Sequence, residues 1–252
     1  MVAKESLSER DICTKYITPA LVKAGWDLQT QIREEVSFTA GRIIVRGKTV
    51  TRGEKKRADY ILYYKNNLPL AIIEAKDASY GVGDGMQQAL GYADVLDIPF
   101  VYSSNGSGFL THVRLPKGKV HEEEIALDAF PSPEDLYQQY LANHQITSDA
   151  RSIVEQDYFQ ELNGKEPRYF QRVAINRTIE AITKGQKRLL LVMATGTGKT
   201  YTAFQIIWRL WKAKTAKRIL FLVDRNILAD QAVMNDFKPF GQAMTKITHR
   251  TV

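Results

Sequence analysis

Asp59, Glu74 and Lys76 have types and spacing that suit the metal-dependent hydrolysis of a phosphodiester. Carboxylate oxygens are ligands that Mg²⁺ takes, with waters and substrate phosphate completing its octahedral shell. A lysine beside such a cation can orient or help deprotonate the attacking water, while the metal stabilises charge on the phosphate. These residues therefore predict that Asp59 and Glu74 bind Mg²⁺ and that Lys76 acts on the water.

The stretch Arg57–Lys76, which contains these residues, is predicted to form a β-hairpin. β-Rich runs lie on both sides of Asn66-Asn67, a pair with turn chemistry. A turn centred between the asparagines places Asp59 opposite Glu74. Like charges directly across a sheet repel each other, and a divalent cation between them makes the pair tolerable. The same register pairs Tyr63 with Leu70 and Ile61 with Ile72, and the two-residue period of a strand puts Lys76 on the face of Glu74.

Gln88 and Tyr92 stand at positions i and i+4 of a helix predicted over residues 84–96, so their side chains share one face. An Asp, a Glu-x-Lys on the next strand and a downstream Gln-x-x-x-Tyr together resemble the RecB-like branch of the PD-(D/E)xK nucleases. Ala58 stands where that motif has its proline. The resemblance implies that Gln88 and Tyr92 support the metal site.

A second motif, ATGTGKT at residues 194–200, follows the apolar run 188–192 and precedes an amphipathic stretch. Strand, glycine-rich loop and helix in that order are the context of a phosphate-binding loop. Lys199 is expected to reach the β- and γ-phosphates, and Thr200 to supply a hydroxyl to Mg²⁺. Met193 stands where the strict pattern has glycine, and the form seen here resembles that of superfamily 2 helicases. Backbone N–H groups that would cradle the phosphates come from Thr195, Gly196, Thr197 and Gly198.

Two flanking segments resemble further motifs of the same superfamily. Residues 169–171, Tyr-Phe-Gln, resemble the Q motif, which implies that Gln171 reads adenine. Residues 219–226 resemble motif Ia, which contacts the nucleic-acid backbone. Asp224 ends an apolar strand there, but we do not assign it as the acid that completes the magnesium shell. The strand follows Lys199 too soon, and no glutamate comes after Asp224 to activate water.

Composition places the chain among ordinary globular proteins. It has 252 residues, 44% hydrophobic and 25% charged, and a single cysteine, which excludes an internal disulfide framework. Residues 1–150 carry 17 Lys and Arg against 20 Asp and Glu, whereas residues 151–252 carry 18 against 8. The basic excess of the second half suits an anionic partner such as nucleic acid or nucleotide. The basic run that leads into Asp59 is either a solvated face or a phosphate contact.

The remaining elements predict a three-layer α/β module followed by a connector. Ser8 is expected to cap a helix that runs to about Lys23. Glu9, in its first turn, either belongs to the cap or adds a third carboxylate to the metal site. Polar residues 142–167 are expected to connect two domains, with the boundary near residue 150. The other expected elements are strands 36–38 and 42–45, paired with each other, strands 100–103 and 108–115, a charged loop at 115–124 and a helix at 134–141.

A RecB-like nuclease followed directly by a superfamily 2 ATPase is similar to the N-terminal part of the R (HsdR) subunit of type I restriction endonucleases. The resemblance runs nearly end to end. It implies an α/β fold with a three-layer, restriction-endonuclease-like nuclease domain at 1–150 and the start of a P-loop RecA-like parallel-sheet domain at 151–252. The implied nuclease residues are Asp59, Glu74, Lys76, Gln88 and Tyr92, and the implied nucleotide residues are Gln171 and residues 195–200.

The same resemblance implies Mg²⁺ and ATP as cofactors, double-stranded DNA as substrate, and methyltransferase (M) and specificity (S) subunits as cytoplasmic partners. It implies no membrane association. The sequence stops at Val252, before any D-E-x-H box or second RecA-like lobe. We therefore expect this chain to bind ATP-Mg²⁺ weakly and to hydrolyse it negligibly.

Two other functions are compatible with these motifs. The first is an ATP-dependent DNA remodeller whose N-terminal domain docks onto DNA or a partner without cutting. The intact set of Asp59, Glu74 and Lys76 favours the nuclease over this alternative. The second is a nucleotide-dependent switch that binds proteins, for which steeply salt-dependent DNA binding would be absent.

Overall fold

The computed structural model describes residues 7–39, 44–46, 49–51, 55–114, 120–161 and 164–247. The chain divides into two compact units, Met1–Arg151 and Ser152–Val252. None of the helices in these described ranges is both long and apolar enough to cross a membrane.

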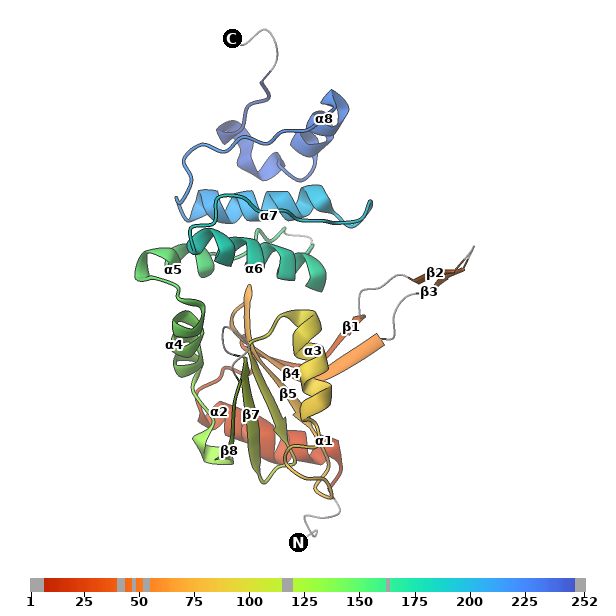
Figure 1. The fold of residues 1–252 in the computed structure, drawn as a ribbon, viewed down its shortest axis with the longest axis vertical. Coiled ribbons are helices and arrows are strands. Elements are labelled where there is room, and N and C mark those ends of the chain that lie inside the picture. The colour runs from red at the N-terminus through yellow and green to blue at the C-terminus, as the bar shows by residue number, and fades with distance from the viewer. Residues whose placement is uncertain are drawn as a thin grey trace. The chain divides into compact units, whose positions relative to one another are not determined.

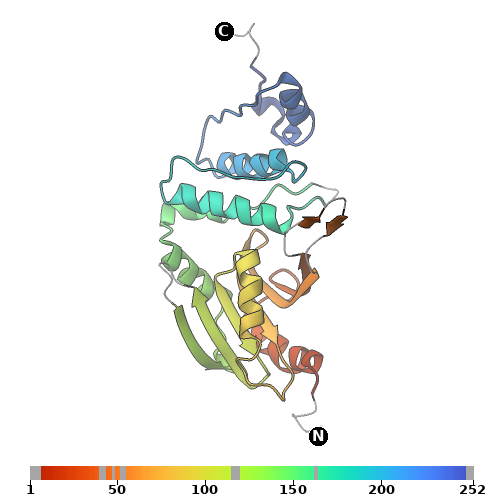
Figure 2. The same cartoon turned by 45° about the vertical axis from the view of Figure 1, so that its right-hand side comes forward.

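The first unit is built on a six-stranded mixed sheet with the order β1-β4-β5-β6-β7-β8 (Figure 1). Only β5 and β6 pair in parallel, and the other neighbours are antiparallel. The helix α3 covers one face of this sheet, and the α1–α2 segment lies on the other (Figure 2). This three-layer α/β arrangement confirms the predicted fold class. The strands are β1 (Ile32–Thr39), β4 (Lys55–Lys65), β5 (Leu68–Ala75), β6 (Phe100–Ser104), β7 (Gly108–Arg114) and β8 (Val120–Ala126).

Helices of the first unit begin where the sequence offers caps. The Ser8 hydroxyl accepts a hydrogen bond from the Asp11 N–H, and the Asp11 carboxylate accepts one from the Ser8 N–H, so the predicted cap is confirmed. Ser132 and Asp135 form a second capping box. The helices are α1 (Glu9–Ile12), a π-helical turn (Cys13–Ile17), α2 (Thr18–Lys23), α3 (Met86–Leu96) and α4 (Pro133–His144), with short 3₁₀ turns at Leu127–Ala129 and Ser148–Ala150.

Two strand predictions for the first unit were wrong. Strand β1 pairs with β4 rather than with residues 42–45. Of that predicted partner, residues 42 and 43 lie outside the described residues, and β2 (Ile44–Arg46) pairs with β3 (Thr49–Thr51) in a separate sheet. The charged loop was also wrong from residue 120 onwards, because β8 pairs with β7 there. Residues 115–119 lie outside the described part of the chain.

The second unit contains four helices and a 3₁₀ turn among its described residues. These elements are α5 (Arg151–Val154), which starts at the unit boundary, α6 (Tyr169–Thr183), α7 (Lys199–Lys212), α8 (Asn226–Met234) and the 3₁₀ turn Lys238–Ala243. Residues 188–192 and 219–223, predicted as strands, form no ladder within the described ranges. A strand exists only where a neighbour supplies hydrogen bonds, and here Leu190 remains 86% and Leu222 78% exposed.

Helix α7 forms hydrogen bonds with the N-terminal segment of the second unit, residues 153–159. Gln205 hydrogen-bonds both backbone groups of Phe159, accepting from its N–H at 2.8 Å and donating to its carbonyl at 3.0 Å. Arg209, one turn further, donates to the carbonyls of Ile153 (3.0 Å) and Val154 (2.7 Å). Both polar side chains are buried. The segment after Ile153 is therefore packed on α7 and is not an isolated linker.

Candidate functional site

The β4–β5 hairpin brings the two predicted metal ligands together. Tyr60 pairs with Ile73, so the register places Asp59 opposite Glu74 as the next pair along the strands. The Asp59 Oδ2 atom accepts a hydrogen bond from the Ala75 N–H at 2.8 Å, which fixes this carboxylate at the end of the ladder. The predicted pairing of Ile61 with Ile72 is confirmed. The pairing of Tyr63 with Leu70 was wrong, because the register shifts after Leu62 and Tyr63 pairs with Pro69.

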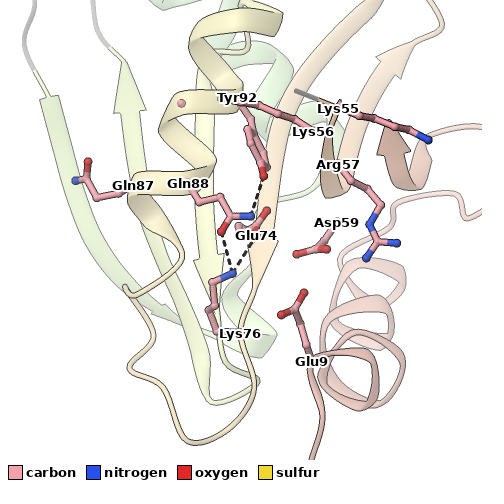
Figure 3. Close-up of a pocket in the computed structure, with 11 residues that line it drawn as sticks. Glu9, Lys55, Lys56, Arg57, Asp59, Glu74, Lys76, Gln87, Gln88 and Tyr92 are labelled. Atoms are coloured by element: carbon pink, nitrogen blue, oxygen red, sulfur yellow. Dashed lines mark hydrogen bonds and ion pairs between the residues drawn. The ribbon is translucent and has the colours of Figure 1, made fainter. Parts of the chain in front are cut away.

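Both carboxylates line a pocket of about 520 Å³ that also contains the other predicted residues of the first motif (Figure 3). The pocket is formed by α1, β4, the end of β5 and one face of α3. Its lining residues are Glu9; Lys55, Lys56, Arg57 and Asp59; Glu74 and Lys76; and Gln87, Gln88, Gly91 and Tyr92.

Glu74 is the buried acid of this site, with only 2% of its surface exposed. Its Oε1 atom accepts from the Lys76 ammonium at 3.1 Å, whereas its Oε2 atom is buried without a hydrogen-bond partner. Burial, and then the charge of Asp59, raise the pKa of Glu74 to about 8 against the lowering effect of Lys76. Burial also raises the pKa of Asp59, despite the hydrogen bond from Ala75. A divalent cation at these oxygens would supply the missing partner and favour the ionised carboxylates.

The donor set fits Mg²⁺ better than a cation that needs a cage of protein ligands. In the described part of the chain, no three Asp, Glu, His or Cys side chains converge closely enough to hold a metal. Mg²⁺ is commonly bound by one or two carboxylates plus waters and substrate phosphates. Glu9 points towards Asp59 from α1 (Figure 3), and it raises the pKa of Asp59 through its charge.

A chain of hydrogen bonds runs from Lys76 into α3. The Lys76 ammonium donates to Gln88 Oε1 at 3.2 Å, and Gln88 Nε2 donates to the Tyr92 hydroxyl at 2.8 Å (Figure 3). The shared helix face predicted for Gln88 and Tyr92 is thereby confirmed. The Tyr92 ring also meets the Phe38 ring edge-on at a centroid distance of 5.3 Å. Lys76 is thus held between an acid and an amide, which restricts the position of its ammonium.

A glycine allows α3 to approach the acids this closely. A Cβ atom on Gly85 would lie 2.8 Å from Ser103 Oγ and 3.1 Å from Glu74 Cγ. The Gly85 N–H also donates to Ser103 Oγ at 3.1 Å. Any side chain at this position would displace the hairpin acid from the start of the helix.

The raised pKa of Glu74 predicts a pH-dependent stability that Glu74→Gln removes. In EDTA, the folded protein holds the Glu74 proton up to a pH of about 8, whereas the unfolded chain releases it near the ordinary value of 4.5. The free energy of unfolding therefore falls as pH rises between these values, by an amount on the order of 2–4 kcal/mol for this group. Urea unfolding from pH 5 to pH 8.5 should show this loss for the parent and a smaller one for Glu74→Gln.

Glu124→Gln is the matched control for that measurement, because Glu124 is exposed on the edge strand β8. It should follow the parent at every pH. Equal pH profiles for the parent and Glu74→Gln would contradict the raised pKa.

In the second unit, the predicted phosphate-binding loop leads directly into α7. Gly196 and Gly198 adopt φ values of 78° and 81°, a region that favours glycine, and Gly198 is the N-cap of α7. Lys199 and Thr200 form the first turn of the helix, and the Lys199 ammonium donates to the Met193 carbonyl at 3.4 Å. Helix N–H groups, a lysine and a hydroxyl therefore lie together, as phosphate binding requires.

Gln171 contacts this loop, which the sequence did not indicate. Its Oε1 atom accepts from the Arg168 N–H and its Nε2 atom donates to the Thr197 carbonyl, both at 2.9 Å. The side chain is 6% exposed. Gln171 therefore supports the loop from α6, and its reading of adenine stays a prediction.

Two loop glycines provide a matched pair of variants. Gly198→Ala should destabilise the second unit more than Gly196→Ala, because a Cβ at Gly198 would lie 2.4 Å from Gln171 Nε2 whereas one at Gly196 meets nothing within 4 Å. Both carry the same left-handed backbone cost of about 1–2 kcal/mol, so the difference isolates the clash. Thermal unfolding without nucleotide measures it. Equal melting temperatures would show that Gln171 does not press on Gly198.

Comparisons with known proteins agree with both halves. Residues 6–117 match the family model described as type I restriction enzyme R protein N terminus, and residues 164–251 match that described as type III restriction enzyme, res subunit. The chain is 54% identical over 248 residues to the type I restriction enzyme EcoAI endonuclease subunit of Escherichia coli, which spans 98% of this chain and 31% of that protein. It is 28% identical to the EcoKI endonuclease subunit of Escherichia coli (strain K12), over 74% of this chain and 19% of that one.

A solved fragment from Vibrio vulnificus YJ016, described as an HsdR subunit of a type I restriction enzyme, shares the fold. It has a TM-score of 0.78 and 39% identity, and the match covers 96% of this chain and 45% of that one. The chain therefore spans about a third of the EcoAI relative and less than half of the solved fragment.

Proposed function

Because the chain belongs to the family of type I restriction enzyme R subunits, we propose that its first unit is a Mg²⁺-dependent DNA endonuclease module. Its second unit is the start of an ATP-binding motor that translocates double-stranded DNA. In the assembled enzyme this subunit works with methyltransferase and specificity subunits in the cytoplasm. The relatives are named as endonuclease subunits of type I restriction enzymes, which supports this assignment.

The unpartnered Glu74 Oε2 atom opposite Asp59 is the observation that carries the nuclease assignment. A buried acid, Glu74, and a half-buried one, Asp59, both with raised pKa values beside a lysine, lower the stability of the fold, so we expect a ligand that offsets this loss. Bound Mg²⁺ supplies a Lewis acid for the phosphate and a water of lowered pKa.

The protein residues position the reaction around that ion. Asp59 and Glu74 would hold it, and the Ala75 N–H fixes the Asp59 carboxylate. Lys76 is oriented by Glu74 and Gln88, so that its ammonium can direct the attacking water towards the phosphorus. The attacking water would release its proton to solvent, and the leaving oxygen would take a proton from a solvent water.

The ATP site in the second unit uses the loop described above. Thr195 to Gly198 offer backbone N–H groups, Lys199 offers its charge to the β- and γ-phosphates, and Thr200 offers a hydroxyl to the accompanying Mg²⁺. Gln171 keeps the loop in place through Thr197. To recognise adenine, the Gln171 amide would have to give up its hydrogen bond to Arg168 or to Thr197.

Crystals soaked in Mn²⁺ test the nuclease proposal. We expect an anomalous peak between Asp59 and Glu74, at about 2.1 Å from one oxygen of each. Crystals of Glu74→Gln should lose this peak and keep any peak at Thr200. Mn²⁺ bound elsewhere with none at Glu74 would instead favour a docking domain that does not cut DNA.

A further inference from the structure

Lys56 is a cation at the pocket for which the described residues offer no carboxylate. Two other cations of the pocket do form ion pairs, Arg57 with Glu35 at 3.7 Å and Lys76 with Glu74 at 3.1 Å. The Lys56 ammonium instead lies over the ring of Tyr92, 5.5 Å from its centroid. A lysine held against an aromatic face keeps its charge and its three donors for another ligand.

The hydroxyl of Tyr92, beside Lys56, can donate a hydrogen bond to the same ligand. The Lys76 ammonium can only donate, so Gln88 presents its oxygen to Lys76 and its nitrogen to Tyr92. The Tyr92 oxygen is therefore the acceptor, and its own O–H must point away from Gln88. Donors aligned in series polarise one another, which strengthens the last one as a donor to an anion.

The wall beside Tyr92 leaves room for such an anion. Gly91 lines the pocket from the middle of α3, and a Cβ atom there would meet nothing within 4 Å. A glycine inside a helix is normally unfavourable, and here it leaves the surface of α3 without a side chain at the position before Tyr92. Without a side chain at Gly91, a nucleic-acid backbone can approach α3 closely.

We propose that Lys56 and the Tyr92 hydroxyl together hold one backbone phosphate of DNA beside the phosphate that is cleaved. This inference rests on the proposed nuclease function and adds a positioning contact to it. The ammonium supplies charge, the hydroxyl supplies direction, and the Gln88 link ties the held phosphate to Lys76. A DNA strand seated at Lys56 therefore enters the pocket in a fixed register relative to Asp59 and Glu74.

Salt-dependent DNA binding by the 252-residue chain tests the proposal. Fluorescence anisotropy with a labelled duplex, in Ca²⁺ and from 50 to 200 mM KCl, gives the slope of log K against log salt. Lys56→Gln should make this slope shallower by about 0.9, the contribution of one phosphate contact. Tyr92→Phe keeps the ring and should weaken binding roughly three- to tenfold with the slope unchanged. The control Lys23→Gln, at an exposed position on α2, should match the parent.

The double variant decides whether both groups hold the same phosphate. If they do, adding Tyr92→Phe to Lys56→Gln should cost less than Tyr92→Phe alone. If the salt slopes of Lys56→Gln and Lys23→Gln are equal, and both variants melt like the parent, the inference is overturned. An intact Mn²⁺ peak in the same protein would still support the nuclease function. A parent that shows no salt-dependent DNA binding overturns the inference, and loss of the Mn²⁺ peak identifies failure of the function itself.

Discussion

Replacing Lys76 by alanine is expected to lower DNA cleavage by the assembled restriction enzyme at least about 10²-fold, with ATP turnover unchanged. The Lys76 ammonium contacts both Glu74 and Gln88. Its removal leaves the proposed metal ligands in place but takes away the group that we propose directs the water. The measurement is conversion of supercoiled plasmid to linear DNA, with phosphate release followed in the same reaction.

Lys23→Ala, an exposed change on the same unit, serves as the control and should cleave as the parent does. Asp59→Asn should resemble Lys76→Ala in cleavage, but it should also lose Mn²⁺, which separates metal binding from water activation. Parental cleavage by Lys76→Ala would remove the lysine from the mechanism.

Lys199→Ala should reduce ATP turnover by the complete subunit to background and stop translocation, because it removes the charge that meets the β- and γ-phosphates. DNA cleavage that depends on translocation should stop with it. Nucleotide binding by the 252-residue chain should weaken by at least about tenfold, measured with a fluorescent ATP analogue. The thermal stability of the nucleotide-free chain should change little, since Lys199 makes only one 3.4 Å contact.

Lys212→Ala tests whether any lysine of α7 would have the same effect. It lies at the opposite end of the helix, over the rings of Trp208 and Trp211. Its loss should leave ATP binding intact. Robust ATP hydrolysis by the 252-residue chain that Lys199→Ala abolishes would show that a catalytic acid exists within it, with Asp224 the first residue to examine.

The hairpin shows how far local pattern carries a prediction. The turn residues and β-rich runs were sufficient for the register of Tyr60, Ile61 and Leu62 with their partners. The register fails next to Pro69, which has no N–H to donate to the ladder, so the strands shift there. That proline was visible in the sequence, and its consequence could have been predicted from its missing donor.

Other elements depend on neighbours that a local pattern does not contain. Residues 122–124 are three consecutive glutamates, poor strand formers, yet they form β8 because β7 offers a free edge. Residues 188–192 show the opposite case, since an apolar run typical of a buried strand has no ladder partner in the described residues.

The candidate site divides in the same way. Spacing predicted that Asp59, Glu74, Lys76, Gln88 and Tyr92 lie together, because each lies on a regular strand or helix, or directly after one, near its partners. Lys56 over Tyr92 joins β4 to α3 across the unit, and sequence spacing does not report such a contact. Gln171 on the loop at Thr197 is likewise a contact between distant segments.

The hydrogen bonds from α7 to Ile153, Val154 and Phe159 restrict where domains can be recombined during evolution. A recombination junction placed after Val154 would leave the buried Arg209 guanidinium in a new protein without the two carbonyls that it binds. The guanidinium would keep its hydrogen bond to Asn176, but a buried donor left without a partner costs about 1–3 kcal/mol, which is a large share of the stability of one domain. Viable chimaeras that join the second unit to a different first domain should therefore inherit the stretch from Ile153 onwards together with α7, and join the foreign domain upstream of it.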